Sequence, residues 1–229
     1  MSDLLRDARL LATLAAAGLD PDRPLITHLV VTRRCNLSCG YCFEYDKVSP
    51  PVPLATLRAR IDDLARLRSV FVTLTGGESL LHPDVAALVA HVRARGMVPL
   101  LNTNGFLLTE GLIERLNQAG LYAMQLSIDN ARPNQVSKKS LKTLLPRLRL
   151  LAAHARFRVR INTVLGSSPP EEALEVARTV VALGFDNNCS LVREASGAIA
   201  PVDDRTRAAY DQIRDLGARL PPLLDDDYT

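Results

Sequence analysis

Six apolar, β-branched segments alternate with amphipathic segments along this 229-residue chain. The apolar segments have the length of buried strands, and apolar residues between them recur at helical spacing. The expected strands cover 25–32, 70–75, 97–103, 122–129, 157–165 and 185–192, and the expected helices about 54–67, 84–96, 110–120, 137–153, 171–183 and 204–219. Six strand–helix units predict an α/β fold with a parallel sheet and helices outside. Six units suit an open, partial (β/α)6 TIM-like barrel rather than a closed barrel of eight strands.

Three cysteines occupy one short stretch, Cys35, Cys39 and Cys42 in RRCNLSCGYCF. The C-x3-C-x2-C spacing offers three thiolates and no fourth ligand nearby. An iron–sulfur cubane has four irons, and protein sites usually ligate all four. A loop that supplies three thiolates therefore predicts a [4Fe–4S] site with one iron open to an outside ligand.

Other uses of these cysteines fit the sequence less well. A structural zinc site needs four ligands in paired knuckles or a Cys/His mixture, whereas Cys189 is distant and the four histidines are scattered. Three clustered cysteines cannot pair off into disulfides, and a chain of this length builds a core without them. On the spacing alone, a structural metal or a chance arrangement stays the alternative to a cluster.

The composition is typical of an intracellular globular enzyme, with 47% hydrophobic residues, 23% charged residues and a net charge of +3. Arginines alternate with acidic residues along helical faces, as in 57–68, which favours a solvated surface over nucleic-acid binding. Residues 1–20 carry Asp and Arg through their apolar run, unlike a signal peptide, and no segment has the length and apolarity of a membrane span. Reduced thiols fit the cytosol, so we expect a cytoplasmic protein without nucleic-acid or membrane partners.

The residues around the cysteines resemble the cluster-binding loop of the radical S-adenosylmethionine (SAM) superfamily, including the aromatic Tyr41 before the third cysteine. TGGESLLHPD at 75–84 resembles the second motif of that superfamily, usually read as GGEP. Further motifs follow in the order of the branch that includes the molybdopterin-precursor synthase and the peptide-modifying enzymes: LNTNGFLL at 101–108, LSID at 126–129 and INTVLG at 161–166. The resemblance covers about residues 25–195 and does not identify the reaction.

The resemblance implies radical chemistry at the cysteine stretch. Cys35, Cys39 and Cys42 would hold three irons of a [4Fe–4S] cluster, and the amino and carboxylate groups of SAM would chelate the fourth. An electron from the reduced cluster would cleave the S–C5′ bond and give methionine and a 5′-deoxyadenosyl radical. The protein would then place this radical against one C–H bond and exclude water.

The second motif would contact SAM through its backbone and one carboxylate. Gly76 and Gly77 would let the end of the second strand approach SAM closely, because they carry no side chain. Glu78 would bind the methionine amino group through a charge-assisted hydrogen bond.

Further polar residues at the expected strand ends match positions that contact SAM in relatives. Asn104, Ser127 and Asn162 would meet its ribose or methionine part. Asp129 would contact the ribose or the substrate, or cap the following loop. Tyr41 would lie beside the adenine, with packing against the barrel wall as the equal alternative. Each of these residues taken singly is as compatible with a turn, but active sites of parallel α/β barrels lie where the strands end.

The sequence departs from the family pattern at two places. Ser79 stands where proline is usual, which removes no ligand. Relatives often have an arginine after the fourth strand that meets the SAM carboxylate, and here Lys138 or Lys139 would replace it as a point charge. The equal alternative is an exposed helix start after an N-cap at Ser137. Cys189 is expected to be a buried apolar residue.

The expected organisation is an N-terminal helical extension over 1–24, a core over 25–195, and a C-terminal helix and tail over 196–229. Many relatives continue into a cysteine-rich extension that binds auxiliary clusters. Either one cluster suffices here, or the chain is a fragment, which the Pro-Pro and acidic run near its end favours.

These observations together predict a radical SAM enzyme that abstracts hydrogen from a small metabolite or a peptide in a biosynthetic pathway. A ferredoxin- or flavodoxin-type protein would supply the electron. Two alternatives stay open, an activase that installs a radical on a partner protein and a non-catalytic iron–sulfur or zinc module. A module that only binds or senses has no need of the polar residues at successive strand ends.

Overall fold

A computed structural model describes residues 14, 15, 18, 20, 22–42, 45–193, 198, 199 and 201–217. Strands and helices alternate along it, and their bounds are β1 (Ile26–Thr32), α2 (Leu54–Arg66), β2 (Phe71–Gly76), the short 3-10 helix η1 (Ser79–Leu81), α3 (Val85–Ala94), β3 (Val98–Thr103), α4 (Glu110–Ala119), β4 (Ala123–Ser127), α5 (Leu141–His154), β5 (Arg158–Leu165), α6 (Pro170–Ala182), β6 (Asp186–Leu191) and α7 (Asp204–Gly217). The predicted series of six strand–helix units is confirmed.

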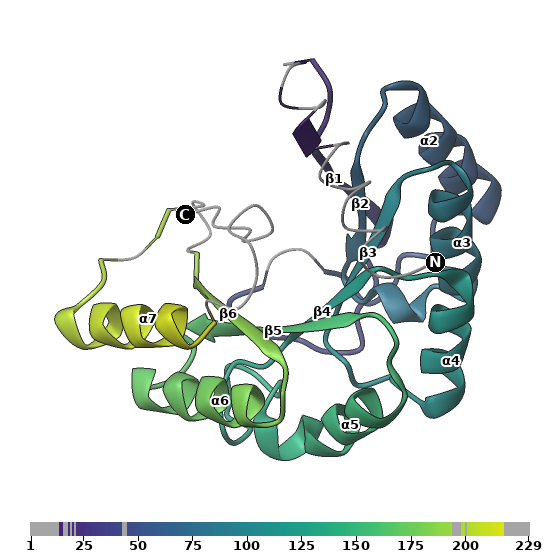
Figure 1. Ribbon diagram of the computed structural model, residues 1–229. Helices are drawn as coiled ribbons and strands as arrows, with labels where there is room; N and C mark the ends of the chain where they lie inside the picture. Colours follow the sequence, from purple (N-terminus) through teal and green to yellow (C-terminus); the bar gives the residue numbers. More distant parts are fainter. Residues whose placement is uncertain are drawn as a thin grey trace.

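The six strands form one sheet in the order β1-β2-β3-β4-β5-β6. Every neighbouring pair is parallel. The sheet is curved, and the helices follow its convex side from α2 to α7 (Figure 1). Because β1 and β6 end the strand order without pairing to each other, the sheet is open. The predicted partial barrel is therefore confirmed.

The two faces of the sheet differ in chemistry. Strand residues that face the helices are apolar and buried in one large core: Leu29, Val31, Val72, Leu74, Leu101, Met124, Leu126, Val159 and Ile161. The residues that alternate with them face the hollow side, and several are polar and half-buried: Asn102, Gln125, Ser127, Arg160, Asn188 and Ser190. Burial of the convex face supplies the hydrophobic stabilisation of the fold, and the hollow face is left for polar groups.

The expected helix bounds agree closely with the structure, with one exception, and capping residues account for the bounds of α4 and for the start of α5. The Thr109 hydroxyl accepts a hydrogen bond from the Leu112 amide at 3.2 Å, and Gly120 ends α4 with a φ of 80°. The exception is α5, expected from about residue 137, which begins at Leu141. The Ser140 hydroxyl accepts from the Thr143 amide at 3.3 Å and caps this helix, so residues 137–140 belong to the preceding loop.

The predicted end segments lie mostly outside the described residues, which lack most of 1–24 and all of 194–197 and 218–229. Leu14 packs against Val70 and Phe71 near the beginning of β2. The division into extension, core and tail stays a prediction. No described helix is long and apolar enough to cross a membrane.

Gly76 and Gly77 lie against the backbone that follows β1. The Gly77 amide donates to the Thr32 carbonyl at 2.9 Å. A Cβ on Gly76 would overlap the Thr32 carbonyl, and one on Gly77 would overlap the carbonyls of Arg33 and Arg34. The absence of a side chain therefore permits a close approach between two backbone segments of the protein itself.

We expect Gly77→Ala to lower the free energy of unfolding by about 1–3 kcal/mol, because the added methyl group meets rigid backbone. Urea denaturation would measure the change. Gly111→Ala in α4 is the matched control, since its added Cβ meets nothing nearer than 4.0 Å and alanine favours a helix by about 0.5–1 kcal/mol. Equal stability of the two variants would contradict the close approach.

Candidate active site

The structure gathers residues from three strand ends around the segment Arg33–Cys42, called here the cysteine loop, which follows β1. Glu78 follows β2, Asn104 follows β3 and Asp129 follows β4. Asn104 contacts the side chain of Cys35, and Asp129 contacts the side chain of Tyr41. Most of the residues expected at the rim are thus in one place, at the carboxyl ends of the strands.

Two of the three loop cysteines are buried, and donors point at their sulfurs. The Leu37 amide lies 3.4 Å from Cys35 Sγ, and Asn104 Nδ2 lies 3.8 Å from it. Cys39 Sγ lies 3.7 Å from the Ser137 hydroxyl. Burial raises the pKa of the Cys35 and Cys39 thiols, whereas the hydrogen bonds favour the thiolate.

The backbone of the cysteine loop is held by the segment that follows it. The Cys35 amide donates to the Asp46 carbonyl at 3.0 Å. Lys47 Nζ donates to the carbonyls of Cys35, at 3.0 Å, and Leu37, at 2.5 Å. Sequence reasoning did not assign this role to Lys47. Only its charge and proximity to the cysteines could have indicated it.

These residues fit a cubane better than a single metal ion. Within the described residues, no three His, Cys, Asp or Glu side chains converge on one ion site. Each thiolate of a cubane binds a different iron, so convergence on one point is not required. Hydrogen bonds to cluster sulfurs are a usual means of tuning such a centre, and Cys35 and Cys39 already have polar neighbours.

Glu78 is 1% exposed and its carboxylate is surrounded by donors of the protein. Its two oxygens accept from the Thr103 hydroxyl at 2.6 Å, the Asn104 amide at 2.7 Å and the Leu80 amide at 2.9 Å. Burial raises the pKa of Glu78, against the effect of these hydrogen bonds. The carboxylate therefore ties the ends of β2 and β3 together. A contact to the SAM amino group would have to use its remaining acceptor capacity.

Ser79, in the place where relatives have proline, strengthens the same junction. Its hydroxyl lies 2.7 Å from the Asn102 carbonyl and 3.3 Å from the Leu74 carbonyl. The substitution thus adds a link between β2 and β3.

Asn104 connects this junction to the cysteine loop. Its amide nitrogen donates to Asn36 Oδ1 at 2.7 Å, and its amide oxygen accepts from the Phe106 amide at 3.1 Å. Asn36, which sequence reasoning did not single out, lies directly after the first cysteine and carries no distinguishing pattern.

A buried ionic cluster joins the cysteine loop to the loop after β4. The Tyr41 hydroxyl donates to Asp129 Oδ2 at 2.7 Å, and Lys139 Nζ donates to the Tyr41 oxygen at 2.6 Å. Lys139 Nζ is also 3.3 Å from Asp129 Oδ2. Burial and the Asp129 carboxylate raise the pKa of Tyr41. Lys138 instead donates to the Asn134 carbonyl at 2.8 Å on an exposed side, so Lys139 is the lysine inside the site.

Ser127 and Asn162 face each other in register on β4 and β5. Asn162 Nδ2 donates to the Ser190 hydroxyl on β6 at 3.1 Å. These side chains belong to the hollow face of the sheet. Cys189 packs beside an apolar cluster of Leu165 and Ile213, as its expected apolar role requires, but it is half-buried rather than buried.

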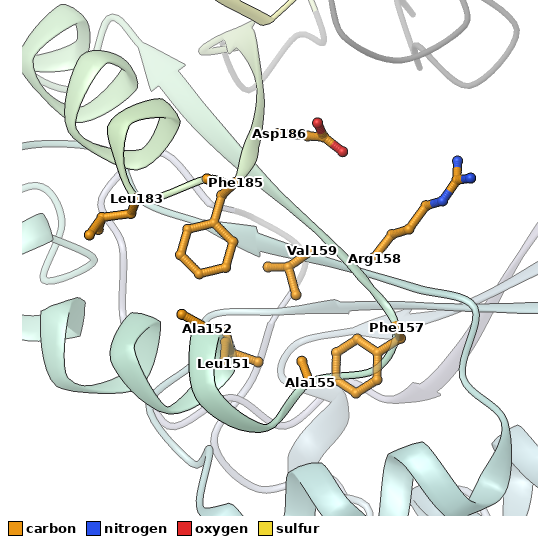
Figure 2. Close-up of a pocket in the computed structure, with 10 residues that line it drawn as sticks. Leu151, Ala152, Ala155, Phe157, Arg158, Val159, Leu183, Phe185 and Asp186 are labelled. Atoms are coloured by element: carbon orange, nitrogen blue, oxygen red, sulfur yellow. The ribbon is translucent and has the colours of Figure 1, made fainter. Parts of the chain in front are cut away.

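A separate pocket lies at the opposite ends of the strands. It is lined by residues before and at the beginning of β5 and β6 and at the ends of α5 and α6, among them Phe157, Leu183 and Phe185 (Figure 2). None of the predicted site residues lines it. The pocket is therefore distinct from the candidate active site.

Comparison with known proteins places this arrangement in a family. Residues 29–193 match the Radical SAM superfamily. The chain is similar to the PqqA peptide cyclase of Xanthomonas axonopodis pv. citri, with 32% identity over 228 residues that cover 86% of this chain and 58% of that protein. The chain thus spans somewhat more than half the length of this relative.

Solved structures show the same fold at low sequence identity. SuiB of Streptococcus suis bound to S-adenosylmethionine superposes with a TM-score of 0.71 at 18% identity, over 94% of this chain and 53% of SuiB. SuiB bound to its precursor peptide SuiA gives a TM-score of 0.71 at 18% identity, over 93% and 50%.

We expect Glu78→Gln to lower the free energy of unfolding by about 1–3 kcal/mol. The NH2 group of the glutamine would replace a carboxylate oxygen that now accepts a hydrogen bond, so two donors would face each other. Thermal and urea unfolding would measure this. Glu175→Gln, at an exposed position of α6, is the control and should change stability by less than about 0.5 kcal/mol. Comparable small effects at both positions would exclude a tethering role for Glu78.

Proposed function

The chain belongs to the radical SAM superfamily, whose members use a [4Fe–4S] cluster and SAM, and from this premise we propose that it is an enzyme that abstracts hydrogen from a peptide. The observation that carries the proposal is the cysteine loop, in which Cys35, Cys39 and Tyr41 lie beside polar side chains that follow β3 and β4. When bound, the cluster and SAM supply reductive cleavage of the S–C5′ bond and hence a 5′-deoxyadenosyl radical.

Cys35, Cys39 and Cys42 would hold three irons of the cluster. The Leu37 amide and Asn104 would donate to the sulfur of Cys35, and Ser137 to that of Cys39. Such donors stabilise the thiolate form that binds iron.

The SAM contacts proposed from the strand ends divide into two groups. Ser127 and Asn162, on the hollow face, have hydroxyl and amide groups that suit a ribose or an amino acid. Gly76, Gly77 and Glu78 would contribute through the backbone of the β2 end, because Gly77 lies against the cysteine loop and the Glu78 carboxylate is already held by protein donors.

One carboxylate oxygen of Asp129 supports the proposal that a ligand binds nearby. Its Oδ1 is buried and has no hydrogen-bond partner within the described residues. A buried carboxylate oxygen without a partner is costly. A donor group of SAM or of the substrate would satisfy it, as the sequence position of Asp129 suggested. Tyr41, whose hydroxyl is held by Asp129, would present its ring on the same side of the site.

The peptide substrate is inferred from the PqqA peptide cyclases, which are similar over most of this chain. The hollow face of the sheet supports this choice, because side-chain amides such as Asn102 and Gln125 can both donate to and accept from a peptide backbone. A small metabolite is the alternative. An electron donor of the ferredoxin or flavodoxin type and a cytoplasmic location complete the proposal.

An anaerobic assay with dithionite and SAM, followed by chromatography, tests the reaction class. We expect 5′-deoxyadenosine from protein that carries a reducible cluster. A complete and reducible cluster that yields no 5′-deoxyadenosine, alone or with peptide added, would favour a module that only binds the cluster.

We expect Cys39→Ala to abolish cluster assembly, because two thiolates do not hold a cubane. Iron content and the visible absorption of anaerobically reconstituted protein measure this. Cys189→Ala is the matched control and should retain the iron of the wild type. Unchanged iron in Cys39→Ala would remove this residue from the ligand set.

We expect Asn162→Ala to weaken SAM binding about 5- to 10-fold, the effect of one lost hydrogen bond of about 1 kcal/mol, with iron content unchanged. Equilibrium dialysis of the loaded protein measures the Kd. Thr163→Val, whose hydroxyl bonds Asn187 at 3.1 Å beside the sheet core, is the neighbouring control. Equal affinity of Asn162→Ala and wild type would place Asn162 outside the SAM site.

A further inference from the structure

Lys139 occupies an unusual position for a lysine. Its side chain is 12% exposed, and its ammonium group lies between the Asp129 carboxylate, at 3.3 Å, and the Tyr41 hydroxyl, at 2.6 Å. The same nitrogen is 5.2 Å from the centre of the Tyr41 ring. Three interactions of one ammonium group therefore converge on one tyrosine and its carboxylate partner.

Stability alone does not account for this ion pair. Removal of two charges from water is expensive, and buried pairs are often no more stabilising than apolar side chains of similar volume. Asp129 is 0% exposed in its side chain. A buried ion pair can instead fix the geometry of the side chain that it contacts, which here is Tyr41.

Tyr41 lies in the cysteine loop between Cys39 and Cys42, so its position constrains both cysteines. Two more contacts join the same segments. The Gly40 amide donates to the Val136 carbonyl at 2.8 Å, and Cys39 Sγ lies 3.7 Å from the Ser137 hydroxyl. The cysteine loop and the loop after β4 are thus in contact at three successive positions.

We propose that Lys139 is a positioning residue for the cluster, which docks the Cys39–Cys42 segment onto the loop after β4 through Tyr41 and Asp129 and places one positive charge beside the cluster. The inference rests on the proposed function for its cluster, whereas the docking of the two loops is a property of the protein alone. The Lys139 backbone amide donates to the Ser137 hydroxyl at 3.1 Å, and the same hydroxyl lies 3.7 Å from Cys39 Sγ, which puts Lys139 next to a proposed cluster ligand.

Hydrogen exchange of the protein without cluster, kept reduced and anaerobic, tests the docking. We expect amides of residues 36–42 to exchange at least about tenfold faster in Lys139→Met than in wild type, because local opening becomes easier. Lys138→Met is the matched control: the neighbouring lysine is exposed and bonds only within its own loop, and its exchange should equal that of wild type.

Tyr41→Phe keeps the ring and the Asp129–Lys139 pair but removes the bridging hydroxyl. It avoids the unpaired buried carboxylate that Lys139→Met leaves, so it tests the docking even if Lys139→Met does not fold. We expect the same faster exchange of residues 36–42. Exchange equal to wild type in Tyr41→Phe would overturn the docking.

The midpoint potential of the loaded cluster tests the charge. Loss of a nearby positive charge disfavours the reduced, more negative cluster, so the potential of Lys139→Met should be lower than that of wild type. Lys139→Arg keeps the charge and should restore both the potential and the electron paramagnetic resonance spectrum. A loss of folding stability alone would change neither the midpoint potential nor the electron paramagnetic resonance spectrum of the loaded protein. A potential equal to wild type in a folded, loaded Lys139→Met would overturn the proposal.

The two measurements separate this inference from the proposed function. A wild-type protein that takes up no cluster would contradict the function, while the exchange of residues 36–42 would still decide the docking. A cluster that loads normally with unchanged exchange and unchanged potential in the variants would contradict the role of Lys139 alone.

Discussion

The site depends on the direct contact between the end of β2 and the backbone that follows β1. The amides of Gly77 and Glu78 donate to the carbonyls of Thr32 and Arg34, both at 2.9 Å. This contact exists because two glycines carry no Cβ to separate the segments. An irregular loop is otherwise a mobile element. Here its first residues are fixed by the sheet, so the first cysteine has a defined position before any cofactor arrives.

Two buried carboxylates extend this arrangement in different ways. Glu78 is satisfied by neutral donors at the end of β3, and Asn104 returns from there to the cysteine loop. Asp129 is satisfied in part by Tyr41 and Lys139. Each carboxylate would be costly without its partners, so the donors are as necessary as the acids. The partners come from different strand ends, so the two carboxylates connect these ends beside the cysteine loop.

The sequence predicted the parts of this structure that depend on local pattern. Apolar periodicity located six strands, and the helix expected over 110–120 agrees closely with α4. The cysteine spacing and the Gly-Gly-Glu motif predicted a candidate site, and the structure brings Cys35 and Glu78 together through Asn104. The start of α5 was expected at Ser137 but is set by Ser140, since either serine can cap a helix and only the folded loop decides between them.

The sequence did not indicate which residues far apart in the chain contact each other. Glycines 76 and 77 were expected to let the strand end approach SAM, and the sequence did not indicate that they also let it approach the protein's own backbone. The choice between Lys138 and Lys139 depends on which side of one loop faces inward. Lys47 and Asn36 act through backbone and amide contacts that leave no pattern in the sequence. In each case the missing information is the path of a loop in space.

The two faces of the sheet differ in packing, so they tolerate amino-acid substitution to different degrees during evolution. Nearly all of the apolar packing lies between the convex face and the helices, while the hollow face presents half-buried amides, hydroxyls and an arginine. Substitutions on the hollow face can alter the polar groups that it presents and disturb little of the core. The chemistry of this face can thus diverge without a large loss of folding stability at each step.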